Sequence, residues 1–195
     1  LTDESREQLW SQSNPYADVA PNMWCNAAVS TMTVGGIVQG YPDGSFRPRA
    51  NITRAEFAAM AVRFFDVEYD GPDLFSDTTG HWASDLINKA ASAGIILGFK
   101  DGTFRPDQTI SREQMAAILY RYAQNEGYKT SQSGKGTEGY LDASSISSYA
   151  VKAMDWAVNA GLLSGKGNNT LAPTAGATRA EVAQIFMNFC TELAE

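Results

Sequence analysis

One sequence plan occurs three times in this chain, and this repetition limits the possible folds more than any other feature. Arg112 follows Arg54 by 58 positions, and Arg179 follows Arg112 by 67. Gly40, Gly98 and Gly165 keep the same two offsets. Repeats of this kind are units that cannot bury an apolar face alone, so three copies are expected to share one core.

The constant offsets divide the 195 residues into parts. We expect an N-terminal extension or short helix at residues 1–13, followed by repeats at 14–70, 71–129 and 140–195. The nine extra positions before the third repeat fall in a stretch rich in Gly, Ser and Thr, which predicts a flexible surface insertion at 130–139. The three repeats together are expected to form one pseudo-trimeric domain.

Each repeat is predicted to contain two helices joined by a turn. The first helix ends at Gly36, Gly94 or Gly161, because glycine readily takes the positive φ of a helix C-terminus. In the second repeat its apolar positions include Trp82, Leu86, Ile87, Ala90 and Ala91. The second helix shows apolar residues at i, i+3, i+4 and i+7 three times: Phe57, Met60, Ala61 and Phe64; Met115, Ile118, Leu119 and Tyr122; Val182, Ile185, Phe186 and Phe189.

Three equivalent apolar stripes predict a mainly α fold with a central three-helix bundle around a pseudo-threefold axis. The first helices and turns would project from it as three prongs. An Asp-Gly pair in the turn, Asp43-Gly44 or Asp101-Gly102, favours a tight turn with at most one residue pair of β ladder around it.

The composition excludes several functions. Fifteen Lys and Arg stand against 22 Asp and Glu, a net charge of −7, so neither generic nucleic-acid binding nor adsorption to an anionic membrane is expected. No apolar run approaches the ~18 residues of a membrane span. One His and two Cys exclude Cys/His zinc clusters. Because no nucleophile–base pair, metal cluster or phosphate loop appears, no catalytic residue, metal or cofactor is expected.

The second helices begin with capping boxes, in which a Thr or Ser is followed three residues later by Glu56, Gln114 or Glu181. Capping does not explain the arginines at 54, 112 and 179, because a cation in the first turn opposes the helix dipole. Each arginine either pairs with an aspartate of a neighbouring repeat, such as Asp18, Asp77 or Asp142, or forms an anion site with free N–H groups. In the second case, replacing Arg54 or Arg112 with Ala should weaken binding and barely change the melting temperature.

An aromatic residue opens each repeat, at Trp24, Trp82 and Tyr149. Such a residue is either a partly buried packing residue or a surface on which a sugar ring stacks beside a charged donor. The glycines of the turns are either turn formers or points where a ligand approaches the backbone closely.

These motifs resemble the surface-layer homology (SLH) family in its triple form. The resemblance rests on the Asp-aromatic openings, on the run Gly-Ile-x-x-Gly-Tyr-Pro-Asp-Gly-Ser-Phe-Arg-Pro at 36–48, and on Thr-Arg-Ala-Glu at 53–56 and 178–181. It covers the chain from about Asn14 to Cys190. It implies a three-pronged spindle that is secreted to the bacterial cell surface and anchors a longer polypeptide non-covalently, without catalysis and as a monomer when isolated.

The resemblance also implies the ligand, an anionic and typically pyruvylated secondary cell-wall polysaccharide held in grooves between prongs. The arginines would meet the ligand carboxylate, and the aromatic residues and turns would line the groove. The expected ligand-binding residues are Trp24, Gly40, Tyr41, Asp43, Gly44, Arg54 and Glu56; Trp82, Gly98, Asp101, Gly102, Arg112 and Gln114; and Tyr149, Arg179 and Glu181. The alternative is a structural module that mediates protein–protein contacts in a surface array.

Departures from the family pattern predict unequal grooves, one or two of them competent. The second repeat has Ser-Arg-Glu-Gln at 111–114, where Glu113 adds a negative charge beside the site. The third repeat departs furthest, with Gly-Asn-Asn-Thr at 167–170, Ala172 and Tyr149. Cys25 and Cys190 lie at opposite ends of the chain, and a disulfide between them is possible in a secreted protein.

Overall fold

The computed structural model describes residues 15–131 and 134–192 and shows a mainly α fold there, as predicted. The helices are α2 (Asn26–Val34), α3 (Arg54–Phe65), α4 (Ser84–Ser92), α5 (Arg112–Asn125), α6 (Val151–Asn159) and α7 (Arg179–Glu192), with a 3-10 turn η1 (Ala143–Ser145). The described ranges contain isolated β-bridges and no longer strand. The extension expected at 1–13 lies outside the described residues.

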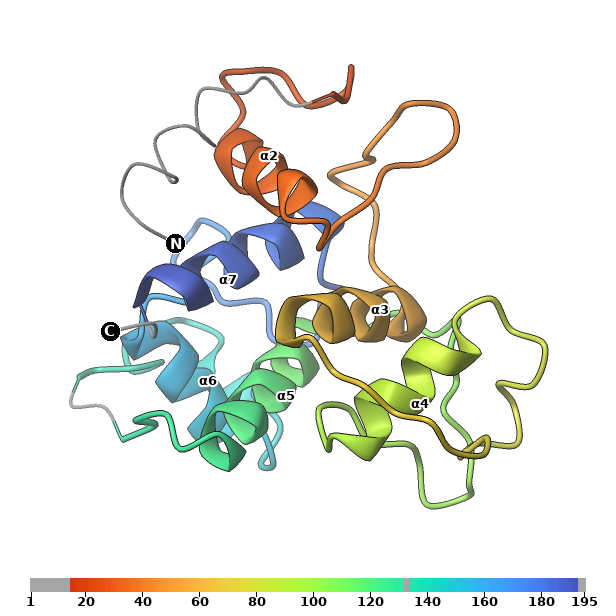
Figure 1. Ribbon diagram of the computed structural model, residues 1–195. Coiled ribbons are helices and arrows are strands. Elements are labelled where there is room, and N and C mark those ends of the chain that lie inside the picture. Colours follow the sequence, from red (N-terminus) through yellow and green to blue (C-terminus); the bar gives the residue numbers. More distant parts are fainter. Residues whose placement is uncertain (1–14, 132–133, 193–195) are drawn as a thin grey trace.

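Helices pack in pairs that cross from one repeat to the next. The second helix of each repeat packs against the first helix of the following one, giving the pairs α3–α4, α5–α6 and α7–α2. Figure 1 shows these pairs arranged around a centre where α3, α5 and α7 converge. Because α7 packs on α2, the last repeat returns to the first and the arrangement closes.

Aromatic side chains join the second helices to one another. Phe65 of α3 stacks on Tyr122 of α5 with ring centroids 3.6 Å apart, and Phe64 packs on Phe186 of α7 at 4.6 Å. Phe57 and Phe186 also stack, at 5.9 Å. The three apolar stripes predicted from the sequence therefore meet through side chains, whereas the closest backbone packing lies within the helix pairs.

Local sequence signals fix the helix ends as predicted. Thr53 with Glu56 and Ser111 with Gln114 form complete capping boxes, and Thr178 with Glu181 makes the same two hydrogen bonds. The first helices also end where predicted, because φ is positive at the glycines that follow them, namely Gly36, Gly94 and Gly161.

A closed ring of three backbone hydrogen bonds links the repeats just before the second helices. Ile52 N–H donates to the Ala177 carbonyl (2.9 Å), Ala177 N–H to Ile110 (2.9 Å), and Ile110 N–H back to Ile52 (3.1 Å). All three residues are fully buried. The isolated bridges lie beside this ring, at Asn51–Thr178, Thr53–Thr109 and Ser111–Gly176. These bridges join neighbouring repeats. The Asp-Gly turns are closed by backbone hydrogen bonds, from Tyr41 N–H to Ser45 and from Phe99 N–H to Thr103, and have no bridge of their own among the described residues.

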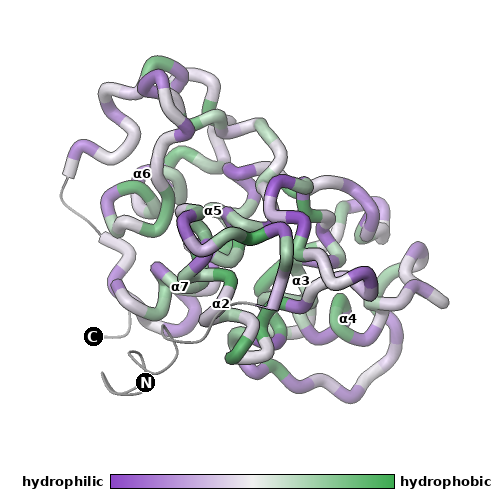
Figure 2. The backbone as a smooth tube through the Cα atoms, turned by 90° about the horizontal axis from the view of Figure 1, so that it is seen from above, coloured by the Kyte–Doolittle hydropathy of each residue, from purple (hydrophilic) through white to green (hydrophobic). Residues whose placement is uncertain are grey.

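The core follows the predicted periodicity with one correction. Ile87 and Ala90 of α4 are fully buried, but Trp82 precedes the helix and is 64 % exposed, so counting it among the apolar positions of this helix was wrong. In Figure 2 hydrophilic residues concentrate on the outer loops and hydrophobic ones on the inner helices. No helix in the described ranges is long and apolar enough to cross a membrane.

Two further expectations concern the insertion and the cysteines. Part of the segment expected to be a flexible insertion is bound to α6, because Thr137 donates to Asp155 through both N–H and Oγ1 and Gly136 N–H donates to Asn159. In the described part of the chain Cys25 and Cys190 are both thiols, so the possible disulfide is not formed. Burial raises the pKa of the Cys25 thiol.

Candidate functional site

The three motif arginines are buried and bind the loop of the following repeat. Each begins a second helix, and their exposed fractions are 5 % for Arg54, 3 % for Arg112 and 4 % for Arg179. In each case Nε and Nη2 donate to two backbone carbonyls. Their acceptors are Phe104 and Leu97 for Arg54, Leu171 and Ser164 for Arg112, and Phe46 and Gln39 for Arg179, at 2.6–2.9 Å. Two of the three nitrogens of each guanidinium therefore link one repeat to the next.

The third guanidinium nitrogen distinguishes the arginines. Arg112 Nη1 lies 3.0 Å from Glu181, and Arg179 Nη1 lies 3.2 Å from Glu56. The corresponding residue for Arg54 is Gln114, and no carboxylate among the described residues pairs with Arg54. Burial, with a smaller contribution from the nearby charge of Arg105, lowers the pKa of Arg54 to about 10, so it stays cationic at neutral pH.

The aspartates considered as partners of the arginines have a different role. Asp18 accepts hydrogen bonds from the N–H groups of Phe46 and Arg47, both at 2.8 Å. Asp77 and Asp142 bind the equivalent N–H groups in their own repeats. The aspartates therefore fix the loop of the same repeat, and the partners of Arg112 and Arg179 are the capping-box glutamates.

A pocket of about 340 Å³ lies beside Arg112 and receives residues from all three repeats. Trp24 comes from the first repeat, Arg112 from the second, and Lys166 and Glu181 from the third. Lys166 Nζ lies 2.7 Å from Glu181 Oε1. Burial alone would raise the pKa of Glu181, but Lys166 and Arg112 outweigh it and lower the pKa below its ordinary value.

Equivalent positions define two related sites. We call the three the Arg54, Arg112 and Arg179 sites. Each contains a motif arginine from one repeat, and the loop and the capping-box Glu or Gln from the next repeat around the ring. The remaining repeat supplies the opening aromatic residue. The position of Lys166 is taken by Tyr41 in the Arg179 site and by Phe99 in the Arg54 site. Tyr41 donates to Glu56 at 3.0 Å, whereas the Phe99 ring centre lies 4.8 Å from the Arg54 guanidinium carbon.

The opening aromatic residues are among the most exposed large apolar side chains described. Trp24 is 63 % exposed, Trp82 64 % and Tyr149 59 %. At this degree of exposure they are not core residues, and much of each ring is open to a ligand. Trp24 lines the Arg112 pocket, and Tyr149 and Trp82 occupy the corresponding positions of the Arg54 and Arg179 sites.

The turns of the first two repeats share one construction. Asp43 pairs with Arg47 at 2.9 Å, and Arg47 lies over the Tyr41 ring at 3.8 Å. The second repeat repeats this contact with Asp101, Arg105 and Phe99. Hydrogen bonds from Thr103, then from Arg105, lower the pKa of Asp101 to about 2. The third repeat lacks the pair, because Ala172 stands where the others have arginine.

Several glycines expected to contact ligand have a structural reason to be glycine. A Cβ at Gly40 would lie 2.2 Å from the Tyr16 ring, and one at Gly98 would lie 2.1 Å from the Phe75 ring. Gly44 and Gly102 have φ of +79° and +80°, which a turn requires. These positions shape the loops that receive the arginine side chains.

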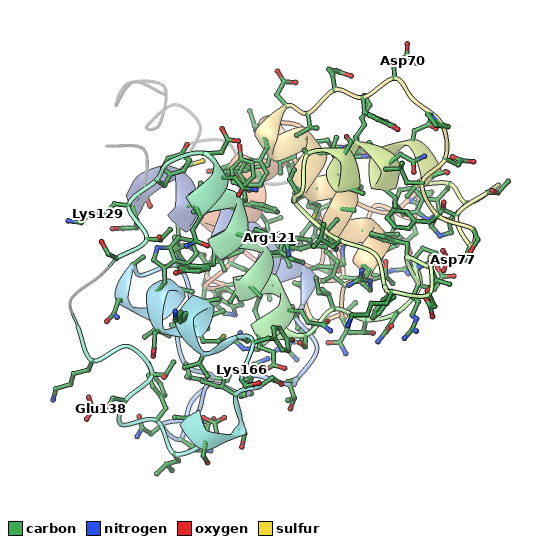
Figure 3. The ribbon with its side chains drawn as sticks, turned by 90° about the horizontal axis from the view of Figure 1, so that it is seen from below. Asp70, Asp77, Arg121, Lys129, Glu138 and Lys166 are labelled. Carbon is green, nitrogen blue, oxygen red and sulfur yellow. The ribbon has the colours of Figure 1, made fainter. Side chains whose placement is uncertain are left out.

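Sequence reasoning overlooked two cations of these sites. Lys166 occupies the same repeat position as Tyr41 and Phe99, so the constant spacing of the repeats could have identified it. It was missed because a lysine stands there in place of an aromatic residue. Arg121, on α5, donates to the carbonyls of Gly94 and Ile95 at 3.0 and 2.7 Å, as Asn188 does to the equivalent carbonyls in the third repeat. Figure 3 shows Arg121 near the middle of the view and Lys166 near the loop that follows α6.

The described residues contain no group of three or more His, Cys, Asp or Glu suited to holding a metal ion. The arrangement is instead one of buried cations beside exposed aromatic rings, in three related copies. Such a surface can bind an anionic sugar: the guanidinium binds the acid group, and the ring packs on the sugar face.

Comparison with known proteins finds a family profile and several relatives. The profile of the S-layer homology domain matches residues 15–58, 74–116 and 139–183. The chain is 38 % identical to Cell surface glycoprotein 1 of Acetivibrio thermocellus over 129 residues, which is 59 % of the chain and 6 % of that protein.

Two further relatives carry informative names. The chain is 35 % identical to an Amylopullulanase of Thermoanaerobacterium thermosulfurigenes over 94 % of the chain and 10 % of the relative. It is 35 % identical to the Cellulosome-anchoring protein of A. thermocellus over 57 % of the chain and 26 % of the relative. The chain thus spans about a quarter or less of each of these relatives.

Proposed function

The chain belongs to the S-layer homology domain family, and we propose on this basis that it attaches a longer polypeptide to the bacterial cell surface. Attachment is non-covalent, through an anionic, pyruvylated secondary cell-wall polysaccharide bound at the arginine sites. The names of the cell-surface and cellulosome-anchoring relatives support a surface role. The match to the amylopullulanase leaves nine-tenths of that protein outside it, which supports a binding module accompanying separate catalytic parts.

The Arg54 site carries this proposal. In the Arg112 and Arg179 sites a glutamate already pairs with Nη1, at the place where a ligand carboxylate would bind. In the Arg54 site Gln114 is neutral, and Nη1 has no carboxylate partner among residues 15–131 and 134–192. A buried cation with no carboxylate in direct contact, and with only the more distant charge of Asp77 opposite it, gains most from an incoming anion, because little water screens the pair.

The sugar would lie against Tyr149 while its carboxylate meets Arg54. Tyr149 is more than half exposed and offers an apolar face with a polar tip. The capping-box carboxylates leave the other two sites with weaker attraction for acids, so the Arg54 site is the principal one. The Arg112 pocket ranks second, because Lys166 adds a cation to Arg112 and Glu181.

Binding to purified sacculi tests the anchoring function. The protein should sediment with sacculi that retain their secondary polymer and remain in solution with sacculi from which that polymer has been extracted. It should also bind polymer bearing pyruvyl groups more tightly than polymer without them. Equal binding to intact and extracted sacculi would contradict the proposal.

A single substitution tests the assignment of the Arg54 site. Gln114→Glu gives Arg54 the internal carboxylate that the other arginines have, and it preserves the capping box. Calorimetry with a pyruvylated monosaccharide should show affinity lower by about tenfold or more, the effect of losing a hydrogen bond to a charged group. The control is Gln124→Glu, the same change of charge at an exposed position of α5. An unchanged affinity for Gln114→Glu assigns binding to another site.

A further inference from the structure

The second repeat carries its acid one position earlier than the other repeats. Residues 112–114 read Arg-Glu-Gln, whereas the first and third repeats read Arg-Ala-Glu. One position on an α-helix is a rotation of about 100°, so the carboxylate of Glu113 points away from the Arg54 site's guanidinium. The shift removes a counter-charge from Arg54 and places a carboxylate elsewhere.

Glu113 binds the segment that leads into α6. Its Oε2 accepts from Ser147 N–H at 2.9 Å, and its Oε1 accepts from Ser147 Oγ at 2.7 Å and from the Tyr149 hydroxyl at 3.3 Å. Glu113 is only 5 % exposed. A carboxylate this deeply buried, which accepts these three hydrogen bonds from Ser147 and Tyr149, holds both residues in one conformation.

The other two repeats combine different residues at these positions. Ala55 and Ala180 correspond to Glu113, and Trp82 and Trp24 correspond to Tyr149. Both alanines are buried, at 1 % and 2 % exposed. Two of the sites therefore pair an alanine with a tryptophan, and the third pairs Glu113 with Tyr149. Only at Tyr149 does this position supply a carboxylate that can bind the aromatic side chain.

We propose that Glu113 is a positioning residue that fixes the Tyr149 ring as the sugar-stacking surface of the Arg54 site. This inference rests on the proposed function. A tyrosine offers less ring area than a tryptophan, and ordering it in advance lowers the entropy lost when a ligand packs on it. The carboxylate also repels an acid group near Tyr149, so an anionic sugar binds with its acid toward Arg54.

The ionisation of Tyr149 is consistent with this geometry. Burial, and then the charge and hydrogen bond of Glu113, raises the pKa of Tyr149 to about 12. The hydroxyl therefore remains protonated and keeps donating to Glu113 across the physiological range of pH. This property gives a readout that does not depend on any ligand.

Four variants test the proposal: Glu113→Ala, Glu113→Gln, Tyr149→Trp, and the double variant Glu113→Ala with Tyr149→Trp, which recreates the combination of the other repeats. With a pyruvylated monosaccharide as probe, Glu113→Ala should bind about 2- to 10-fold more weakly, the range expected for losing the order provided by a hydrogen bond. The double variant should recover affinity to within about twofold of the wild type, since a tryptophan at this position needs no carboxylate. Glu113→Gln, which keeps the acceptor oxygen, should lose less than Glu113→Ala.

The Tyr149 ring is followed independently by NMR of tyrosine labelled with ¹³C at Cζ, assigned with Tyr149→Phe. In Glu113→Ala its pKa should fall from about 12 toward the ordinary value of 10.0, and melting temperatures are measured for all variants. The proposal is overturned if Glu113→Ala binds as the wild type does, or if the double variant stays as weak as Glu113→Ala. If the wild type itself fails to bind the probe, the proposed function fails, and the NMR titration still decides whether Glu113 orders Tyr149.

Discussion

Arg179 donates a hydrogen bond of 2.6 Å to the carbonyl oxygen of Gln39, 140 positions earlier in the chain. The bond joins the start of the last helix to the loop of the first repeat, and Arg54 and Arg112 make the same contact with the repeats that follow them. The arginine that marks the family motif is therefore a structural link between repeats. This structural role changes which substitutions can test binding cleanly.

Arg179→Lys should destabilise the protein strongly. A lysine cannot donate to both carbonyls and pair with Glu56, so buried polar groups lose their partners. The free energy of unfolding should fall by about 3–5 kcal/mol, as for a broken buried ion pair. Urea denaturation measures this, with the exposed Arg49→Lys as control, expected to change stability by less than about 0.5 kcal/mol.

Alanine at Arg54 or Arg112 should also destabilise the protein, contrary to the expectation that it would barely change the melting temperature. Each side chain is at least 95 % buried and donates to two backbone carbonyls. Loss of binding in such variants would not separate recognition from folding. Gln114→Glu is the cleaner test because it leaves every arginine in place.

Trp24→Ala and Trp82→Ala should separate binding from stability. Both rings are more than 60 % exposed, so their removal should change the free energy of unfolding by less than about 0.5 kcal/mol. Each should weaken sacculus binding if its site is occupied, as loss of a stacking surface implies. Leu141→Ala, at a 76 % exposed position, is the control. A tryptophan whose removal leaves binding unchanged marks an unoccupied site.

Acid should weaken the fold through Glu181. Its pKa is lowered in the folded state, so its contribution to stability is complete above the ordinary pKa of 4.5 and is lost as pH falls through the folded value. Stability measured from pH 6 to about pH 3 should therefore decline less steeply in Glu181→Gln than in the wild type. Glu138→Gln, an exposed residue, should leave the slope unchanged.

Gly98→Ala should be more damaging than Gly102→Ala. A Cβ at Gly98 would lie 2.1 Å from the Phe75 ring and 2.9 Å from the Thr103 carbonyl, so packed groups must move. At Gly102 nothing lies within 4 Å, and only the positive φ opposes a side chain, at a cost of about 1 kcal/mol. Thermal unfolding compares the two. Equal losses would mean that the loop adapts around Gly98.

The periodic features of the sequence predicted the fold well. The spacing of residues such as Phe57 and Phe186 identified the second helices, and the capping boxes and glycines placed their ends, because these signals depend on residues close in sequence. The cross-repeat partners were not predictable in the same way. Nothing near Arg54 in sequence indicates that Phe104 and Leu97 supply its acceptors, 50 and 43 positions away.

The sequence indicated which residue types belong to the candidate sites, but it did not indicate which repeats contribute to each site. Each site takes its arginine, its loop and its aromatic residue from three different repeats, as the Arg112 pocket shows. A groove therefore cannot be assigned to one repeat, and the departures of the third repeat are distributed: Tyr149 belongs to the Arg54 site and Lys166 to the Arg112 site. The assignment of these residues to ligand binding stays a prediction.

The ring of hydrogen bonds through Ile52, Ala177 and Ile110 limits how this architecture can vary. Each repeat donates one of these hydrogen bonds and accepts another, so the ring leaves no unpaired group to which a fourth repeat could add. A shortened chain would leave a buried donor and a buried acceptor unmatched, which would favour borrowing the missing repeat from another molecule. Three repeats therefore complete the ring. A chain truncated at a repeat boundary should associate with copies of itself, whereas the three-repeat chain closes the ring alone.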